Sequence, residues 1–403
     1  MKVIGTEVYR RIASPDSSRN SEGSFIRLKN GRIMHAYSHY DTSSITGEDW
    51  TAGDIAACYS DDEGKTWHGE DILLTMEEEG LDRNSSKTGQ NLMSVSLLRM
   101  RNSDLGMVYL RYIRYDHPEM FFRRSGDEGV TFSEPVQVTV PGLRPETMYG
   151  AALNSSARYL SCGRILVPTY HNAGGQRIAM FFASDDDGHT WRELRTKCSI
   201  GISKSRSGLE EPNLVELPGG VLWAFARTDM SRQYEMFSFD NGDTWTDPQP
   251  SYEFTSPPAP MAAEIMPDSK GVAAVWNPVP FFYNPARQPE SRTSDFTVQR
   301  NPLAIAVSRD GARTWCEFRD GNSFSKMKVI YATDSDTGGA AYPSIFCTDE
   351  AVLVCFFTYE TNGLDLVIKR ITYDELFENV CDGVDNAEKY WKAYYLEKGI
   401  DLK

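Results

Sequence analysis

The chain has 403 residues, of which 40% are hydrophobic, and its formal net charge is −15. This hydrophobic content is ample for a large buried core. No run of Lys and Arg interrupts the negative charge, which argues against a nucleic-acid partner and against an anionic membrane surface.

The cysteines and the N-terminal segment bear on the compartment. Seven cysteines lie at scattered positions from Cys58 to Cys381 and form no Cys-x-x-Cys pair. Most stand in apolar runs such as AVLVCFF, which indicates buried thiols in a reducing environment. The segment MKVIGTEVYRR lacks the apolar stretch of a signal peptide, and no segment approaches the length of a membrane span. We therefore expect a cytoplasmic protein, or a secreted one if a leader has been removed.

Short, loosely alternating segments separated by Gly, Asn and Asp turns predict β-strands, among them RIMHAYSHY, DIAACYS, GRILVPTYH and AVLVCFFTYE. An octapeptide with the outline Ser-x-Asp-x-Gly-x-Thr-aromatic recurs between them. Its five copies are 54 to 70 residues apart and begin at Ser60, Ser125, Ser184, Ser238 and Ser308. This spacing suits four-stranded blades, of which the stretch up to Tyr373 holds about six. We expect an all-β fold, a six-bladed β-propeller whose last blade combines C-terminal strands with a strand from the N-terminus.

The octapeptide itself makes sense as a structural element. Its short acid and its glycine permit a tight turn with positive φ, its Ser and Thr can bond the turn backbone, and its aromatic residue can fill the space between blades. It contains no nucleophile–base pair, and it lacks the distal Glu of an EF-hand calcium loop. We interpret it as a turn rather than as a catalytic motif.

The pattern changes after Tyr373. The segment DNAEKYWKAYYLEK has helical composition, with Tyr390, Trp391, Tyr394 and Tyr395 on one face of the expected helix. We predict a propeller over residues 1–373 and a short C-terminal helix within an extension over residues 374–403, packed on the propeller. A dimer contact is the alternative role for this helix, and the oligomeric state stays open.

The five octapeptides resemble the Asp boxes, or bacterial neuraminidase repeats (BNR repeats), of the sialidase superfamily. The resemblance extends from about residue 8 to residue 373 and implies a six-bladed propeller with neuraminidase-like activity. Asp boxes also occur in propellers that are not sialidases, so the functional residues must match separately.

The segment EEPNLVELPGGVLWAFAR is a predicted hairpin with its turn at residues 218–220. Glu211 and Arg227 are equidistant from Gly219, so antiparallel pairing should place them face to face. Glu210 would take the place of Glu211 if the register shifts by one residue, and a purely structural ion pair is the alternative. In sialidases the corresponding segment supplies a catalytic Glu and one arginine of a triad that binds the substrate carboxylate. The resemblance therefore assigns these roles to Glu211 and Arg227.

The resemblance also implies a third arginine and a nucleophile. Arg300, in TVQRNPLAIAV, precedes the strand that leads into the last Asp box, and Arg292 is the alternative. Tyr342, in TGGAAYPSIF, matches the nucleophilic tyrosine of the last sialidase blade, and the small residues before it leave room around its ring. The alternatives are a surface arginine and a blade-edge aromatic residue.

The N-terminal region departs from the family pattern. Sialidases place their first arginine in a Tyr-Arg-Ile-Pro motif, and the matching place in RNSEGSFIRLKNGRI holds Ser21 and Glu22. Arg19 lies two residues earlier and could reach the same space, whereas Arg10 lies too far upstream. Glu22 would bring negative charge beside a substrate carboxylate, pair with an arginine, or bind a sugar hydroxyl.

The acid/base of a sialidase is an Asp on the loop that enters the first Asp-box strand. Asp54 takes that place here, and Asp41 and Asp49 on the same polar loop are alternatives.

The resemblance thus implies an exo-acting glycoside hydrolase of the sialidase type, which releases terminal sialic acid or a related acidic sugar with retention. The expected catalytic residues are Tyr342, Glu211 and Asp54, and the expected substrate-binding residues are Arg19, Arg227, Arg300 and Glu22. A glycosidase or lyase for another acidic, uronic-acid-type glycan and a non-catalytic sugar-binding propeller are the alternatives. The six histidines do not cluster at ligand spacing, so we expect no metal and no cofactor.

Overall fold

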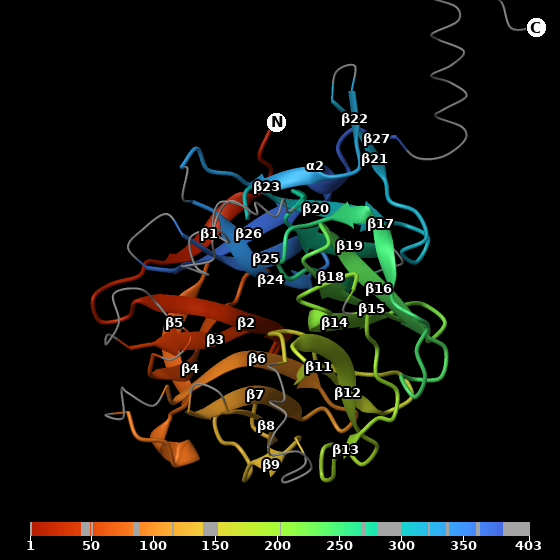
Figure 1. Cartoon of the computed structure of the whole chain (residues 1–403). Helices are drawn as coiled ribbons and strands as arrows, with labels where there is room; N and C mark the ends of the chain where they lie inside the picture. Colours follow the sequence, from red (N-terminus) through yellow and green to blue (C-terminus); the bar gives the residue numbers. More distant parts are fainter. Residues whose placement is uncertain are drawn as a thin grey trace, which may run out of the picture.

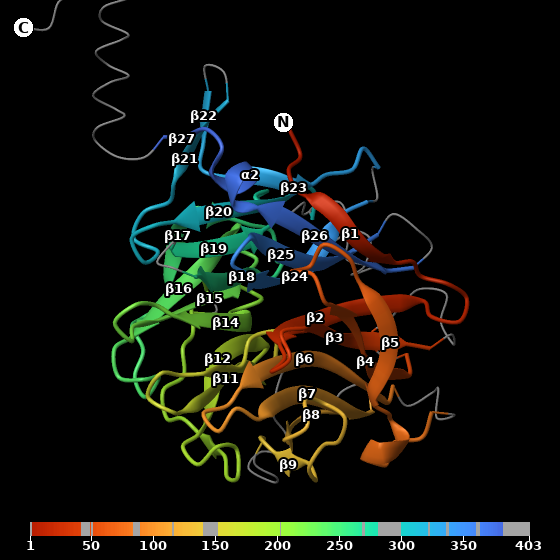
Figure 2. The ribbon, with the colours of Figure 1, turned by 180° about the vertical axis from the view of Figure 1, so that it is seen from behind.

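The computed structural model describes residues 2–41, 49, 51–83, 89–114, 117–139, 152–201, 203–267, 271–280, 300–320, 323–335, 338–359 and 363–381. In these ranges, six four-stranded antiparallel sheets follow one another around a common centre (Figures 1 and 2). The prediction of an all-β, six-bladed propeller is therefore confirmed.

Blades 1 to 4 each consist of four consecutive strands, which follow one another from the innermost to the outermost. Blade 1 contains β2 (Arg19–Arg27), β3 (Ile33–Tyr40), β4 (Gly53–Ser60) and β5 (His68–Leu74). Blade 2 contains β6 (Asn91–Arg99), β7 (Leu105–Arg114), β8 (His117–Ser125) and β9 (Val136–Gln137). Blade 3 contains β10 (Arg158–Tyr159), β11 (Ile165–Ala173), β12 (Gln176–Ser184) and β13 (Arg192–Glu193). Blade 4 contains β14 (Glu210–Glu216), β15 (Leu222–Arg227), β16 (Arg232–Ser238) and β17 (Gln249–Thr255).

The last two blades are less regular. Blade 5 contains β18 (Ala262–Met266), β19 (Gly271–Trp276), β20 (Leu303–Ser308) and β23 (Lys328–Tyr331). Blade 6 contains β24 (Ala340–Cys347), β25 (Ala351–Thr358), β26 (Asp365–Thr372) and, outermost, β1 (Thr6–Arg11). Because β1 pairs with β26, the N-terminal strand closes the ring, as the sequence predicts.

Two additions lie beside the propeller. The strands β21 (Glu317–Asp320), β22 (Ser323–Ser325) and β27 (Val380–Cys381) form a small sheet that stands away from the blades at the top of Figure 1. The short helix α2 (Tyr373–Phe377) follows β26, and Thr372 and Glu375 cap it reciprocally. A 3₁₀ turn, η1 (Glu77–Glu79), follows β5. The expected helix around Tyr390 lies outside the described residues, and no described helix is long and apolar enough to cross a membrane.

The core lies between the blades. Six clusters of buried hydrophobic side chains each join two neighbouring blades, and one of them joins blade 6 to blade 1. The octapeptide aromatic residues pack against these clusters, as expected. They are Trp67, Phe132, Trp191, Trp245 and Trp315.

The Ser, Asp and Thr side chains of all five octapeptides make the same hydrogen bonds. In the first, Ser60 Oγ donates to Asp62, while the amide and hydroxyl of Thr66 donate to its two carboxylate oxygens at 2.8 and 2.7 Å. The fifth copy has Ala312 where the other four have glycine. Ala312 also has a positive φ, 64°, and its amide still bonds Ser308 Oγ. These turns follow the third strand of blades 1 to 5, at one end of the blades that we call the Asp-box end.

Candidate active site

The opposite end of the blades carries a second repeated feature, a β-bulge in the innermost strand. Strand pairing slips at this point in β2, β6, β14 and β24. In each case the second residue of a four-residue segment has a φ between 46° and 57°, a conformation that is uncommon for non-glycine residues. The segments are Ser21-Glu22-Gly23-Ser24, Met93-Ser94-Val95-Ser96, Glu210-Glu211-Pro212-Asn213 and Ala341-Tyr342-Pro343-Ser344. A bulge of this kind re-aims a side chain, and Glu22, Ser94, Glu211 and Tyr342 hydrogen-bond one another in pairs. We call this end the bulge end.

The first pair is Tyr342 and Glu211, which come from blades 6 and 4. Tyr342 Oη donates a hydrogen bond of 2.9 Å to Glu211 Oε1. Burial raises the pKa of the Tyr342 phenol well above its usual value, and the charge of Glu211 raises it further against the opposing effect of Arg227 and Arg300. Burial also raises the pKa of Glu211, again against Arg227. The phenol therefore carries its proton beside a carboxylate that is placed to receive it.

Two arginines flank this pair. The Arg227 guanidinium lies 6.0 Å from the Tyr342 ring centroid and that of Arg300 lies 5.6 Å from it. Both donate to the same carbonyl oxygen, that of Pro258, at 3.3 Å. The Arg300 backbone is tied to the start of β24, because its carbonyl accepts bonds from the Ala340 amide and from Asn277 Nδ2, both at 2.9 Å. Residues distant in sequence are thus held together around Tyr342.

The hairpin register differs from the prediction by one residue. Glu210, not Glu211, lies opposite Arg227, because the bulge adds a residue to β14 between Glu210 and Asn213. Both carboxylates nevertheless contact this arginine: Glu210 binds Nη2 at 2.9 Å and Glu211 binds Nε at 3.2 Å. Arg177 lies 3.4 Å from the other oxygen of Glu210.

The second bulge pair is Glu22 and Ser94, from blades 1 and 2. Ser94 Oγ donates to Glu22 Oε2 at 2.6 Å, while Glu22 Oε1 is bound by Arg19. Arg19 also binds Asp49 and lies 5.7 Å from the centroid of Phe357, whose ring stacks on Tyr342 at 5.3 Å. Phe357 thus links Arg19 to Tyr342, and Glu22 lies close enough for its charge to act on the Tyr342 phenol.

Gly23 is required beside Glu22. A Cβ at this position would lie 2.3 Å from the ring of His35, which is fully buried behind the bulge. The valine of blade 2 and the proline of blades 4 and 6 would not fit at this position, so the close approach of His35 explains why blade 1 has glycine.

The three loop aspartates are not equivalent. Asp54 lies in an ion pair with Arg83, at 2.7 and 2.8 Å, and also accepts the Met76 amide at 2.8 Å. Asp41 binds the same arginine. Asp49, by contrast, contacts Arg19, and its side chain is 66% exposed. The structure thus groups Asp49, rather than the predicted Asp54, with the bulge residues.

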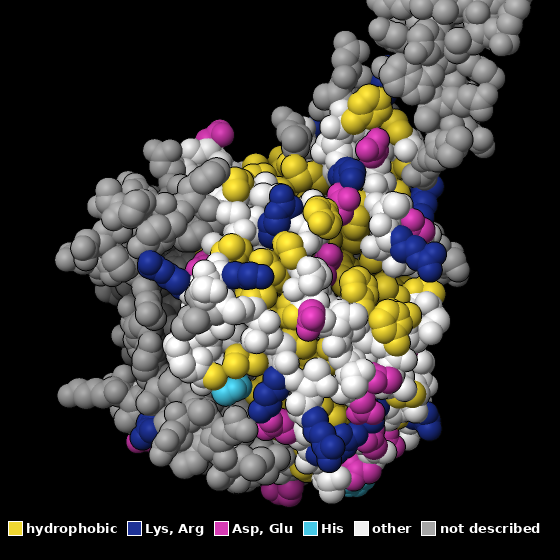
Figure 3. Space-filling view, turned by 45° about the vertical axis from the view of Figure 1, so that its right-hand side comes forward, with side chains coloured by type: hydrophobic (Ala, Val, Ile, Leu, Met, Phe, Trp, Pro, Cys, Tyr) yellow, Lys and Arg dark blue, Asp and Glu magenta, His cyan; other side chains and the backbone are white. Residues whose placement is uncertain are grey.

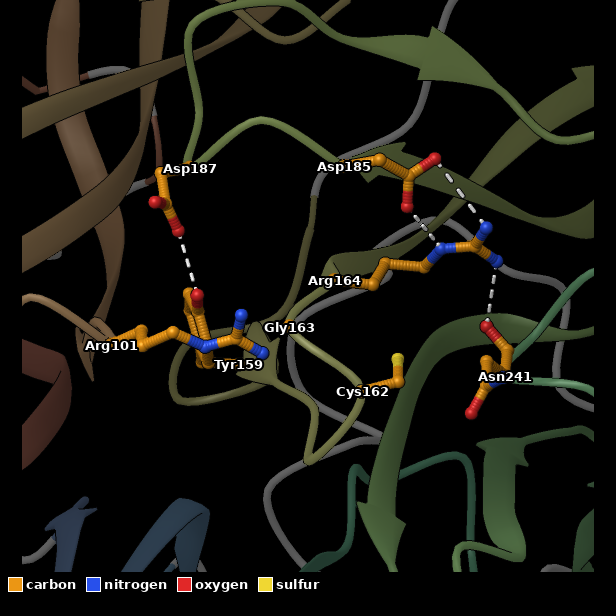
Figure 4. Close-up of a pocket in the computed structure, with 8 residues that line it drawn as sticks. All are labelled: Arg101, Tyr159, Cys162, Gly163, Arg164, Asp185, Asp187 and Asn241. Atoms are coloured by element: carbon orange, nitrogen blue, oxygen red, sulfur yellow. Dashed lines mark hydrogen bonds and ion pairs between the residues drawn. The ribbon is translucent and has the colours of Figure 1, made fainter.

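A separate cavity of about 330 Å³ lies at the Asp-box end of blades 2 to 4 (Figure 4). Its walls carry Arg101 and Cys162, the ion pair of Arg164 with Asp185, and the 2.6 Å bond from Tyr159 to Asp187. It contains no tyrosine–glutamate pair. Within the described ranges, no three His, Cys, Asp or Glu side chains could together hold a metal ion. Arg292, which the sequence offers as the alternative to Arg300, lies outside the described residues.

Comparisons with known proteins agree with the propeller fold. The family of the BNR repeat-like domain matches residues 43–355, more than half of the chain. The anhydrosialidase of Macrobdella decora is 29% identical over 133 residues, which are 32% of this chain and only 16% of that relative. A Dyadobacter fermentans protein of unknown function has a TM-score of 0.64 at 18% identity, and the match covers 92% of this chain and 99% of that one. The intramolecular trans-sialidase from Ruminococcus gnavus has a TM-score of 0.63 at 15% identity, with 92% and 98% covered.

The chain belongs to the BNR repeat-like family of the sialidase superfamily. At 18% and 15% identity, the two solved structures show that this superfamily member shares their fold, and the substrate is a separate question.

The sequence did not point to several residues of this superfamily member's site. Ser94, Phe357 and Tyr359, which accepts a 2.8 Å bond from Arg300, carry no motif of their own. Ser94 could have been found by aligning SEGS, MSVS, EEPN and AYPS as a repeat, because the second position of each is the bulged one. Nothing in the local sequence marks Phe357 or Tyr359.

Proposed function

We propose that the protein is an exo-acting, retaining glycoside hydrolase of the sialidase type, which releases a terminal sialic acid or a related acidic sugar. The observation that carries this proposal is the buried Tyr342–Glu211 hydrogen bond between two arginines. A phenol nucleophile suits an anomeric carbon that bears its own carboxylate, because a carboxylate nucleophile would meet like charge there. Most glycosidases, whose substrates lack that carboxylate, use two carboxyl groups instead.

In the first step, Tyr342 Oη attacks the anomeric carbon while its proton passes to Glu211, and the glycosidic bond breaks. Glu211 Oε1 is already the acceptor of the phenol hydrogen bond, so the proton needs no rearrangement. Arg227 and Arg300 would bind the substrate carboxylate, since a guanidinium offers paired donors and stays charged. Water then attacks the anomeric carbon, the bond to the Tyr342 oxygen breaks, and Glu211 returns the proton to that oxygen, with net retention.

Asp49 is our proposed acid/base. It would protonate the leaving oxygen in the first step and take a proton from water in the second. Its exposed side chain can meet both aglycone and water, whereas Asp54 is held by Arg83 and the Met76 amide and is only 9% exposed. Asp49 also contacts Arg19, which links it to the bulge residues.

The test is incubation with 2,3-, 2,6- and 2,8-linked sialosides, followed by identification of the released sugar by NMR. Free α-sialic acid as first product is the expected outcome. An anhydro sugar would retain the tyrosine chemistry but replace hydrolysis by intramolecular transfer, the activity named for the leech and Ruminococcus gnavus proteins. A folded protein that leaves all three sialosides intact would contradict the sialic-acid proposal, and a panel of uronic-acid glycans would then test the alternative that Glu22 suggests.

A further inference from the structure

Two arginines at the bulge end are already paired with acids of the chain itself. Arg19 contacts Glu22 and Asp49, and Arg227 contacts Glu210 and Glu211. Arg177 also contacts Glu210, and Arg300 acts on Glu211, so the carboxylate of a bound sugar would be a fifth acid beside four arginines. In a partly buried cluster this addition is costly unless the excess negative charge is removed.

A proton bound by one of the four acids would remove it, and the geometry distinguishes between them. Asp49 is largely exposed, so water screens its charge. Glu211 must stay ionised to accept the phenol proton. Glu210 lies between Arg227 and Arg177. Glu22 is 3% exposed and, among the described residues, forms an ion pair with one arginine, Arg19.

Ser94 allows Glu22 to hold a proton without losing a bond. The serine hydroxyl lies 2.6 Å from Glu22 Oε2. A hydroxyl both donates and accepts, so it donates to the carboxylate and would accept from the carboxylic acid after a rotation of its hydrogen. Neither protonation state of Glu22 leaves a buried oxygen unpaired at this contact.

The surroundings favour the neutral form. Burial raises the pKa of Glu22, and Arg19 opposes this effect while Asp49 and Glu211 add to it. Titratable groups on six segments interact electrostatically with Glu22, among them Arg19, Tyr40, Asp49, Tyr112, Glu211 and Tyr342. Arg19 is the one cation among them, so a further carboxylate would shift the balance toward protonation.

We propose that Glu22 takes up a proton from solvent when an acidic sugar binds, so that this site binds the sugar anion together with a proton. The inference rests on the proposed function, because it requires a carboxylate ligand at Arg227 and Arg300. Its consequence is that affinity for the anionic ligand weakens as the pH rises, by up to about tenfold per pH unit where uptake is complete.

The test is isothermal titration calorimetry with the 2,3-dehydro analogue of sialic acid, in two buffers of different ionisation enthalpy at each pH from 5 to 8. The wild-type protein should show uptake that approaches about one proton per ligand at its maximum. The methyl ester of the same ligand, which lacks the carboxylate, should bind with no uptake. Glu22→Gln should bind the ligand that carries the free carboxylate with a proton uptake close to zero.

Two further variants keep the result interpretable. Glu264→Gln is the control, since Glu264 is another carboxyl whose pKa is raised by burial, but its ion pair is with Arg158 and not with an arginine of the bulge end. It should keep the wild-type uptake. Ser94→Ala removes a bond that favours ionised Glu22, so its uptake maximum should move to higher pH even if Glu22→Gln does not fold.

If wild-type protein binds the ligand with the free carboxylate but takes up no proton, this inference is overturned and the proposed function stays intact. Uptake that persists in Glu22→Gln would do the same. No binding of sialic or uronic acid ligands would overturn both.

Discussion

The two ends of the propeller repeat their backbone in different ways. At the Asp-box end, five turns keep nearly the same side chains and make the same hydrogen bonds. At the bulge end, four innermost strands repeat the same backbone shift, but the re-aimed residues are Glu22, Ser94, Glu211 and Tyr342. Constant side chains on a repeated backbone indicate a structural requirement shared by all blades. Varied side chains on a repeated backbone indicate a site that each blade supplies with a different group.

The charged side chains at the two ends also differ in how far they are buried. Figure 3 shows basic and acidic side chains intermixed on one face of the molecule. At the Asp-box end such groups form exposed pairs, as Arg192 does with Asp185 at 2.9 Å. Exposed pairs of this kind contribute little to stability. At the bulge end Arg19 and Glu22 are almost fully buried, so each charge there has a large effect on its neighbours.

The largest expected effect comes from removing the hydroxyl at the bulge of blade 6. Tyr342→Phe should lower kcat/KM on a sialoside by at least about 10³-fold, because the nucleophile is lost while the ring remains. Steady-state kinetics with a chromogenic sialoside measures this, and circular dichroism checks the fold. Wild-type rates in this variant would mean that the bulge end is not the catalytic end.

The second effect separates two aspartates of one loop region. Asp49→Asn should reduce kcat by about 10²- to 10⁴-fold, the usual contribution of a general acid. Asp54→Asn should instead destabilise the fold by about 1–3 kcal/mol through its bond to Arg83, with kcat of the folded protein retained. Steady-state kinetics and urea unfolding of both variants test this assignment. A loss of kcat in Asp54→Asn but not in Asp49→Asn would return the acid role to Asp54.

A third, intermediate effect compares an arginine from each end. Arg300→Ala should raise KM by about 10- to 100-fold, since a charge-assisted bond to the substrate is lost. Arg164→Ala, in the cavity of the Asp-box end, should leave KM unchanged because its bonds go to Asp185 and Asp243. Equal effects of the two substitutions on KM would remove the proposed distinction between the ends.

The smallest effect concerns an Asp box alone. Hydrogen bonds from the hydroxyl and amide of Thr131 lower the pKa of Asp127 to about 2. Its unfolded pKa is about 3.9, so the bonds stabilise the fold above about pH 4 and are lost as the pH falls through about 2. The unfolding free energy of Asp127→Asn should therefore be slightly below that of wild type at pH 7 and approach it as the pH falls below about 2. Denaturant titrations at several pH values test this, and kcat at pH 7 should not change.

The Asp boxes and the blade count could be predicted because their causes are local. The bonds of Asp62 reach residues at most four positions away, and the octapeptide spacing directly reflects the four strands of a blade. The site was predicted in part. Glu211, Arg227, Arg300 and Tyr342 came from the resemblance and do lie together, but the partner of Arg227 in the register was missed by one residue. The alternation of apolar and polar residues predicts a strand whose residues all pair in an even register. It gives no sign of a bulge with a positive φ at a glutamate.

Short-range sequence is sufficient for the turns, the strands and the ring of blades, because hydrogen bonds within a few residues and alternating hydrophobic side chains specify them. Only the tertiary structure decides which charges meet. It joins Tyr342 to Glu211 across 131 positions, binds Asp54 to Arg83, and leaves Asp49 beside Arg19. These pairings depend on closure of the ring and on the path of the loops, and the free energy of a buried charge depends on all the groups around it.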